Sequence, residues 1–333
     1  MSMPLRMPDR DVVTTGRVVV TRTLPPAGMA ALDELGLVID VLGDAPPERE
    51  RLLRAVPGAA AIVSVLTERI DAEILDAAGP GLRIVANVAA GVDNIDLAAA
   101  ADRGVVVTNT PDVLDEATAD LAFALILATT RRVVEADRFI RSGEPWIWGP
   151  NDWIGLQLSA GATVGIVGLG RIGMAVARRA SAFGARIVAT GSRASSDEAA
   201  ALGVIPVELD ELFRTSDIVT LHCPLTPQTR GMVDAARIRS MRPGSTLINT
   251  GRGPLVDEEA LADALEAGHL AGAGLDVHEH EPRVNDRLRA SERVVLLPHI
   301  GSAGAATRDQ MGRLAVRNVA EVLSGRPAVT PVG

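Results

Sequence analysis

The sequence predicts an α/β fold of two doubly wound parallel-sheet domains, and three observations support this prediction. At 333 residues the chain has the length of about two domains of ~150 residues each. Short runs of β-branched residues alternate with amphipathic helical stretches, which is typical of parallel sheets with crossover helices. The alternation occurs in two series, and the second begins at Thr163 with a strand that leads directly into a glycine-rich turn.

The first series runs from Arg17 to Thr108. Predicted strands include 18–21, 60–65, 82–86 and 105–108, and predicted helices include 27–35 and 71–78. Residues 1–15 precede this series and are expected to form a disordered tail.

A connecting segment follows. Pro111 breaks the alternation, because a proline restricts the backbone of the residue before it. A long helix is predicted over 115–132 and a further helix over 133–141. The stretch 143–150 has the composition of a loop and holds two of the three Trp residues.

The second series has predicted strands at 164–168, 186–190, 218–221, 246–249, 273–277 and 294–297. Asp257 is predicted to cap a helix that runs to Ala267, and Gly268 is predicted to close it. A last helix is predicted over 305–323.

Composition narrows the class of protein. With 47% hydrophobic and 23% charged residues the chain is typical of a globular protein. A net charge of −9 without a basic run argues against binding to nucleic acid or to anionic membranes. The single Cys223 fits a reducing compartment, and the longest apolar run, 121–128, is far short of the ~20 residues that cross a bilayer. No signal peptide is recognised, so a cytoplasmic location is predicted.

A glycine-rich turn marks a dinucleotide site. Gly168, Gly170 and Gly173 form a G-x-G-x-x-G pattern between an apolar strand and an amphipathic helix. The first glycine permits a tight turn, the second lets a pyrophosphate approach, and the third allows close helix–strand packing. The helix N-terminus then offers N–H groups and a positive dipole end to the phosphates. The residues predicted to bind the cofactor here are Gly168, Leu169, Gly170, Arg171, Ile172 and Gly173.

The end of the next strand indicates which dinucleotide binds. A site for NAD usually places Asp or Glu there, on the ribose 2′-hydroxyl. The sequence has no acid between Met174 and Ser196, and Ser192 and Arg193 follow Gly191 near the expected acid position. A missing carboxylate, together with an Arg and hydroxyls, suits a 2′-phosphate. NADP is therefore the preferred cofactor, with NAD as the alternative.

Three further motifs follow in order along the chain. They are Asn249-Thr-Gly-Arg252-Gly-Pro, Gly274-Leu-Asp276-Val-His-Glu-His-Glu281-Pro and Leu297-Pro-His299-Ile-Gly-Ser-Ala. Together with the glycine-rich turn and His222-Cys-Pro-Leu-Thr-Pro, they resemble the D-isomer-specific 2-hydroxyacid dehydrogenase family over about residues 17–325. The stretch that begins at Thr110 and the Trp-containing loop are most similar to the glyoxylate/hydroxypyruvate reductases.

The resemblance implies an enzyme that reduces a small 2-keto acid, glyoxylate or hydroxypyruvate, to the D-2-hydroxy acid with NAD(P)H. It also implies a Rossmann nucleotide-binding domain over 109–301, inserted into a flavodoxin-like substrate domain formed by 16–108 and 302–333. Hinges are expected near Asn109 and Ser302. A homodimer is implied, built by the long helix after Pro111 and the Trp-containing loop.

Three residues suit the chemistry of such a reduction. Arg252 follows a predicted strand, and its planar guanidinium can form a fork with the carboxylate and carbonyl oxygens of a keto acid. His299 also follows a strand and is the natural general acid. Glu281 would hold the imidazole ring, fix its tautomer and favour the imidazolium. The family resemblance assigns these same roles to the three residues.

The resemblance places further residues at the site. The cofactor contacts that it implies outside the turn are Thr118, Pro224, Thr250 and Asp276. Of these, Pro224 and Asp276 would flank the nicotinamide. The N–H groups of Ala90 and Gly91 would meet the substrate carboxylate, and Trp148 would reach toward the substrate site of a second copy. The sequence departs from the family at Ala89, where Gly is usual, and at Asp120, where Glu is usual.

A metal site is not predicted. His278 and His280 alternate with Glu279 and Glu281, but a single H-x-H pair without further ligands is weak support for a metal. Both histidines are expected to be exposed loop residues. Cys223 lacks a His–acid arrangement of its own, so it is not expected to be a nucleophile.

Two alternatives stay open. One is a dinucleotide-sensing protein, like the corepressors that resemble this family and keep an Arg–Glu–His set. The other is a dehydrogenase for another 2-hydroxy acid, such as D-lactate or phosphoglycerate; a formate dehydrogenase would be expected to have Gln at position 281. A phosphoglycerate enzyme should supply a basic residue near 64–67, where the sequence has none, and Glu68 would repel a phosphorylated substrate if its side chain faced the cleft.

Overall fold

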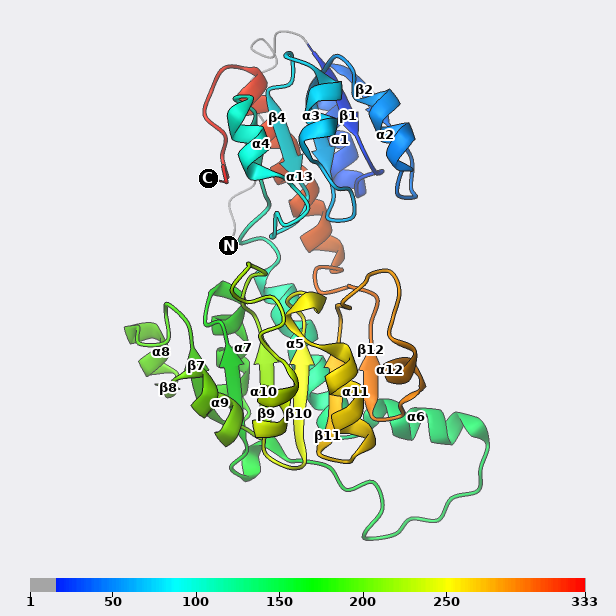
Figure 1. Cartoon of the computed structure of the whole chain (residues 1–333), viewed down its shortest axis with the longest axis vertical. Helices are drawn as coiled ribbons and strands as arrows, with labels where there is room; N and C mark the ends of the chain where they lie inside the picture. Colours follow the sequence, from blue (N-terminus) through cyan, green and yellow to red (C-terminus); the bar gives the residue numbers. More distant parts are fainter. Residues whose placement is uncertain (1–15, 333) are drawn as a thin grey trace. The chain divides into compact units, whose positions relative to one another are not determined.

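The computed structural model describes residues 16–332, so the tail expected over 1–15 lies outside the described part of the chain. Two compact α/β units make up this part (Figure 1). The first unit contains the residues up to Leu114 and those from Ser302 onward, and the second is the continuous stretch Asp115–Gly301. The second unit is therefore an insertion in the first.

A five-stranded parallel sheet forms the centre of the first unit, in the order β2-β1-β3-β4-β5. This is the flavodoxin-like order, and it confirms the predicted fold class. The strands are β1 (Arg17–Val20), β2 (Val38–Val41), β3 (Ala59–Ser64), β4 (Ile84–Asn87) and β5 (Val106–Thr108). The helices are α1 (Pro26–Glu34), α2 (Arg49–Ala55), α3 (Ala72–Ala78), α4 (Leu97–Asp102) and α13 (Ala305–Leu323).

A seven-stranded parallel sheet forms the centre of the second unit, in the order β12-β11-β10-β9-β6-β7-β8. This is the Rossmann order with one strand added at the β11 edge. The strands are β6 (Thr163–Val167), β7 (Arg186–Thr190), β8 (Val204–Pro206), β9 (Ile218–Leu221), β10 (Ser245–Asn249), β11 (Leu270–Leu275) and β12 (Val294–Leu296). The helices are α5 (Asp115–Thr130), α6 (Val133–Ser142), α7 (Arg171–Ala182), α8 (Asp197–Ala201), α9 (Leu209–Thr215), α10 (Ala235–Ser240), α11 (Glu258–Glu266) and α12 (Asp286–Ala290), with short 3-10 turns η2 (Leu158–Ala160) and η3 (Gly253–Leu255).

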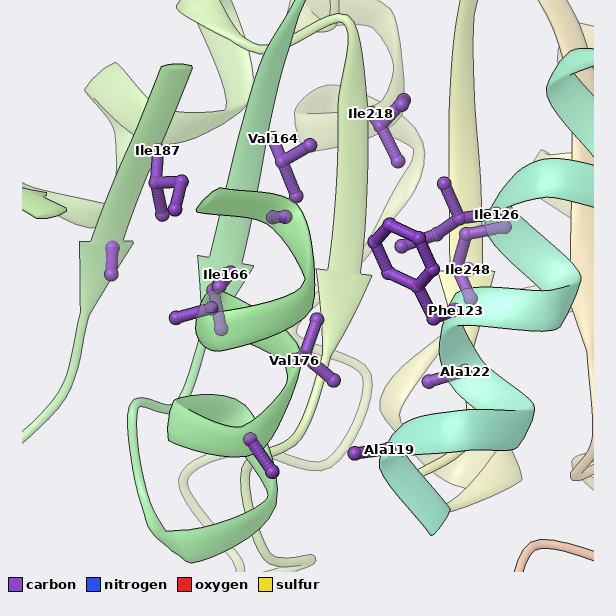
Figure 2. Close-up of a cluster of buried hydrophobic side chains, with 14 of the residues drawn as sticks. Ala119, Ala122, Phe123, Ile126, Val164, Ile166, Val176, Ile187, Ile218 and Ile248 are labelled. Atoms are coloured by element: carbon purple, nitrogen blue, oxygen red, sulfur yellow. The ribbon is translucent and has the colours of Figure 1, made fainter. Parts of the chain in front are cut away.

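One core of the second unit lies between its sheet and helices α5 and α7. Figure 2 shows Phe123 and Ile126 of α5 directed toward Ile218 and Ile248 of the sheet, with Val176 of α7 beside them. All five side chains are buried. Because this packing fixes the strands from one face, the loops at the carboxyl edge of the sheet start from rigid positions.

Most predicted elements occur within a few residues of their expected bounds. The strands over 186–190 and 218–221 and the helix over 305–323 have the predicted limits, and Asp257 caps α11 by accepting the N–H of Ala260. The strands β2 and β8 were not predicted. Both are edge strands of only 4 and 3 residues with exposed positions, so neither has a long apolar run.

The segment between β5 and α5 packs with the first unit. The N–H of Thr110 donates to the carbonyl oxygen of Ala89 at 2.8 Å, and the Asn109 side-chain amide donates to that of Ala90 at 2.7 Å. The chain consequently enters the second unit after Leu114, later than the crossing expected at residue 109. Between residues 16 and 332 no helix is both long enough and apolar enough to cross a membrane.

Candidate active site

The glycine-rich turn joins β6 to α7 at the carboxyl edge of the seven-stranded sheet. Gly168 has a φ of 93°, and a Cβ at this position would lie 2.6 Å from the backbone nitrogen of Cys223. A Cβ on Gly173 would lie 2.3 Å from the carbonyl oxygen of Gly168, so this position needs glycine for close helix–strand packing. Gly170 instead borders open space, because a Cβ there would meet no atom within 4 Å.

The start of α7 has the donors that a phosphate needs. Gly170 is the N-cap, and because glycine has no side chain, no side-chain oxygen of the N-cap residue accepts the first N–H groups of the helix. The N–H of Leu169 donates to the carbonyl oxygen of Thr190 at 3.0 Å and is therefore used within the fold. The N–H groups of Arg171 and Ile172 belong to the first helical turn, where helices bind anions. The open space over Gly170 and this helix start fit the pyrophosphate of a dinucleotide.

The end of β7 carries no carboxylate. Thr190 is followed by Gly191, whose Cβ would lie 2.7 Å from the backbone of the glycine-rich turn. Ser192 is exposed, and the Arg193 guanidinium forms an ion pair with Glu198 of α8. The partner Glu198 was not predicted. A 2′-phosphate at this strand end would share Arg193 with that carboxylate.

Arg252 lies in a loop that Asn249 holds. The buried Asn249 amide donates to the carbonyl oxygen of Arg252 at 2.9 Å and accepts the N–H of Gly251 at 3.0 Å. The Arg252 guanidinium donates to the carbonyl oxygen of Gly251 at 2.9 Å. Asn249 was not predicted to have a role, although a polar residue at the end of an apolar strand is a signal that could have identified it.

His299 and Glu281 form a hydrogen-bonded pair. The ring Nδ1 of His299 lies 2.9 Å from Oε2 of Glu281, and His299 has a positive φ of 56°. Burial opposes ionisation of Glu281, but the hydrogen bond and charge of His299 outweigh it and hold the pKa of the Glu281 carboxyl below its usual value. The Glu281 carboxyl is therefore ionised where its Oε2 faces Nδ1 of His299.

Asp276 holds the loop that carries His299. It directly follows β11, is buried, and accepts the N–H groups of Ile300 and Gly301 at 2.7 Å each. Burial raises the pKa of Asp276, against the effect of these two N–H groups. Thr118 of α5 lies beside the same loop, since a Cβ on Gly301 would be 3.5 Å from its hydroxyl oxygen. Two residues predicted as cofactor contacts thus adjoin the His299 loop.

His278 is buried, which corrects the expectation of an exposed loop residue. Only 5% of its surface is exposed, because its ring Nε2 turns inward to the carbonyl oxygen of Leu297 at 3.0 Å. Its backbone N–H donates to Oε1 of Glu281 at 3.1 Å. His280, two residues further on, is exposed. Across residues 16–332 no group of three or more His, Cys, Asp and Glu side chains is arranged to hold a metal.

Two more predicted cofactor contacts lie near His222. Thr250 is buried, with its hydroxyl 3.5 Å from Nδ1 of His222, and the other ring nitrogen lies 2.8 Å from the hydroxyl of Thr220. Burial lowers the pKa of His222 to about 4, so the ring is neutral at physiological pH. Pro224 is exposed, and its carbonyl oxygen accepts the hydroxyl of Thr229 at 2.7 Å.

In the first unit the predicted substrate loop follows β4 and is held by two asparagines. The Asn87 amide donates to the carbonyl oxygen of Gly91 and to Oδ1 of Asn94, both at 3.0 Å. The Asn94 amide donates to the carbonyl oxygen of Val65 at 3.1 Å. The loop that contains Ala90 and Gly91 is therefore tied to the loop that follows β3. Neither asparagine was predicted to have a role.

A basic side chain lies beside the loop after β3, where none was expected. Nη1 of Arg22 is 3.4 Å from the Thr67 hydroxyl and 3.8 Å from Oε1 of Glu68. Glu68 is buried, with 4% exposed, and accepts the hydroxyl of Thr21 at 2.7 Å and the N–H of Val65 at 3.0 Å. The carboxylate thus does not project to repel a substrate, and it offsets the charge of Arg22.

The fold and the second unit's site define a class of protein. A Rossmann turn, with Arg252, Glu281 and His299 following three adjacent strands of the same sheet, is typical of an oxidoreductase that uses a nicotinamide dinucleotide. Residues 123–301 match the family model described as D-isomer specific 2-hydroxyacid dehydrogenase, NAD binding domain. The chain belongs to the D-isomer-specific 2-hydroxyacid dehydrogenase family, which confirms the resemblance seen in the motifs.

Similar proteins cover almost the whole chain. The glyoxylate reductase of Thermococcus onnurineus is 46% identical over 322 residues, or 95% of each chain. A Thermus thermophilus protein of known structure is 46% identical, with a TM-score of 0.89, over 95% of this chain and 100% of that one. An NADPH-dependent glyoxylate/hydroxypyruvate reductase from Sinorhizobium meliloti, solved with NADP and malonate, is 36% identical, with a TM-score of 0.82, over 96% of this chain and 97% of that one.

Proposed function

We propose that the protein reduces glyoxylate or hydroxypyruvate to the 2-hydroxy acid, with NADPH as the preferred cofactor. The observation that carries the proposal is the 2.9 Å contact between His299 and Glu281. These two residues follow β12 and β11, and Arg252 follows the adjacent strand β10. The Thermococcus and Sinorhizobium relatives, named for glyoxylate and hydroxypyruvate, support the substrate class.

Each catalytic side chain has one task in this reaction. The dinucleotide, when bound, supplies the hydride that reduces the carbonyl carbon. Arg252 binds the carboxylate and polarises the carbonyl oxygen through its fork of donors. Protonated His299 gives its Nε2 proton to the carbonyl oxygen, which becomes the hydroxyl. Glu281 stays ionised and holds the ring by Nδ1, so that Nε2 remains the donor.

The two units divide the work in this proposal. Dinucleotide binding belongs to the domain predicted over 109–301, and carboxylate binding by the N–H groups of Ala90 and Gly91 belongs to the substrate domain of 16–108 and 302–333. The asparagine contacts of the Gly91 loop support this assignment, because a fixed backbone presents its N–H groups without an ordering cost.

The preference for NADPH rests on the end of β7. The strand ends without a carboxylate for a 2′-hydroxyl, Ser192 is exposed, and Arg193 is one residue further on. The ion pair with Glu198 holds the guanidinium at this place, so the cation is oriented before a phosphate arrives.

A homodimer is part of the proposal, and it rests on an apolar surface of the second unit. Helix α6 has no buried residue, and the loop after it exposes Trp146 by 63%, Ile147 by 91% and Trp148 by 76%. Neighbouring large apolar side chains that are this exposed are typical of an interaction surface, and a second copy of the chain would cover them. Sedimentation of the wild-type protein at micromolar concentration should give the mass of a dimer; a monomer would overturn this part.

A turnover assay tests the function. Oxidation of NADPH and of NADH is followed with glyoxylate, hydroxypyruvate, pyruvate and phosphohydroxypyruvate. The highest kcat/KM should belong to glyoxylate or hydroxypyruvate with NADPH. Dinucleotide binding without turnover on any keto acid would favour a sensing protein, and a preference for pyruvate or the phosphorylated acid would favour another dehydrogenase.

A further inference from the structure

We propose that His278 is a positioning residue that holds Arg252, Glu281 and His299 in their working arrangement. The inference rests on the proposed function, because it concerns the side chains that the reduction uses. His278 itself does not touch substrate in this proposal and acts only through its neighbours.

His278 contacts both segments of the His299–Glu281 pair. Its backbone N–H donates to Oε1 of Glu281 at 3.1 Å, while Oε2 of the same carboxylate faces His299. Its ring Nε2 lies 3.0 Å from the carbonyl oxygen of Leu297, two residues before His299. One residue thus fixes the carboxylate and the segment that leads to the imidazole.

His278 also contacts the loop of Arg252. A Cβ on Gly253 would lie 1.9 Å from the carbonyl carbon of His278, so the two backbones are in direct contact. Gly253 immediately follows Arg252 and begins the 3-10 turn η3. The backbone of the Arg252 loop therefore packs directly against the peptide group of His278.

The ring of His278 is held in one orientation. The carbonyl oxygen of Leu297 can only accept, so Nε2 carries the proton of this hydrogen bond. The other nitrogen, Nδ1, is buried and lies 3.9 Å from Oε1 of Glu258, beyond hydrogen-bond distance. Glu258 is itself buried and accepts the N–H of Glu279 at 2.9 Å, and burial raises the pKa of its carboxyl.

A side chain that only filled space at position 278 would not need the hydrogen bond that the His278 ring makes with Leu297. Burying a polar ring costs free energy unless its hydrogen bonds are made, and an apolar side chain would fill the same space without that cost. The contact that the ring makes goes to the segment of the general acid. The geometry therefore favours positioning over packing.

Three variants test the proposal. His278→Gln keeps an N–H donor at nearly the reach of Nε2, whereas His278→Asn keeps a polar amide that is too short to reach Leu297. His280→Gln is the matched control, because His280 is exposed in the same loop. Each variant is checked by its Tm, by NADPH binding, by kcat and KM, and by a ¹⁵N-histidine NMR titration of the His299 ring.

His278→Asn should lower kcat by about 10- to 100-fold, the usual effect of misplacing a catalytic group by about 1 Å. NADPH binding should stay unchanged, and the pH midpoint of the His299 ring signals should fall, because its contact with Glu281 loosens. His278→Gln should restore kcat and midpoint together, and His280→Gln should match the wild type.

Equal kcat and equal midpoints in the Asn and Gln variants would overturn the proposal. So would a loss of kcat that follows only a lower Tm while the midpoint stays in place. The NMR titration needs no turnover, so the positioning role is decided even where the wild-type protein reduces none of the keto acids and the proposed function fails by itself.

Discussion

Replacing Glu281 by Gln should shift the alkaline limit of the reduction to lower pH. The substitution keeps the size of the side chain but removes the charge that lies 2.9 Å from Nδ1 of His299. In the proposed mechanism the reduction needs the protonated ring, and the negative charge of the carboxylate stabilises the positive charge on that ring. Without the charge, the ring loses its proton at a lower pH, and activity fades earlier as pH rises.

The size of the shift follows from the geometry. A charge-assisted hydrogen bond is worth about 1.5–3 kcal/mol, and about 1.4 kcal/mol corresponds to one pH unit. The two side chains are 23% and 31% exposed, so solvent screens part of the interaction and the lower end of the range applies. We therefore expect kcat/KM on the alkaline limb to fall by about tenfold relative to the wild type.

The assay is kcat/KM for glyoxylate at saturating NADPH, measured between pH 5.5 and 10. Glu279→Gln is the matched control, because Glu279 lies two residues away and its side chain is 37% exposed beside His280. The control should keep the wild-type limb. If Glu281→Gln lowers the plateau but leaves the limb in place, Glu281 orients the ring without stabilising its charge, and the electrostatic part of the reasoning is refuted.

Arg193→Ala should raise KM for NADPH and leave KM for NADH nearly unchanged, and equal losses with both cofactors would contradict a 2′-phosphate contact. Gly170→Ala should weaken binding of both dinucleotides at an unchanged Tm, because its Cβ would enter only open space; unchanged KM values would show that the pyrophosphate lies elsewhere. Trp148→Ala should alter keto-acid preference in a folded protein, whereas dissociation with unchanged preference would indicate interface packing only. Glu68→Gln should raise the ratio of kcat/KM for phosphohydroxypyruvate to that for hydroxypyruvate by about tenfold, because Arg22 loses its counter-charge. An unchanged ratio would show that Arg22 does not take part in substrate selection.

The sequence predicted the parts of the molecule that local patterns encode. Apolar strands with adjoining glycines gave the Rossmann turn, and Arg252, Glu281 and His299 could be proposed because each stands in a short motif after a strand. The edge strand β2 was not predicted, because Val38 is 66% exposed and the strand lacks the buried apolar side chains that indicate a sheet.

The same local patterns could not predict contacts between residues that are far apart in the sequence. The H-E-H-E alternation around His278 has the polarity of an exposed loop, and its burial depends on Leu297, which is 19 positions away. Arg22 is likewise invisible in the local sequence of the loop after β3, because the fold brings β1 beside β3. Burial of a polar residue is decided by its tertiary partners, and a single sequence does not display them.

The two units hold their candidate substrate loops by the same means, and this means can be recognised in the sequence. Asn87 is the last residue of β4 and Asn249 the last of β10, and both are buried at the end of apolar strands. A buried amide must satisfy donors as well as an acceptor, and the nearest polar groups are those of the loop that follows. Asn87 therefore binds the carbonyl oxygen of Gly91, and Asn249 binds that of Arg252. In both loops predicted to meet the substrate carboxylate, an asparagine of the preceding strand thus fixes the backbone.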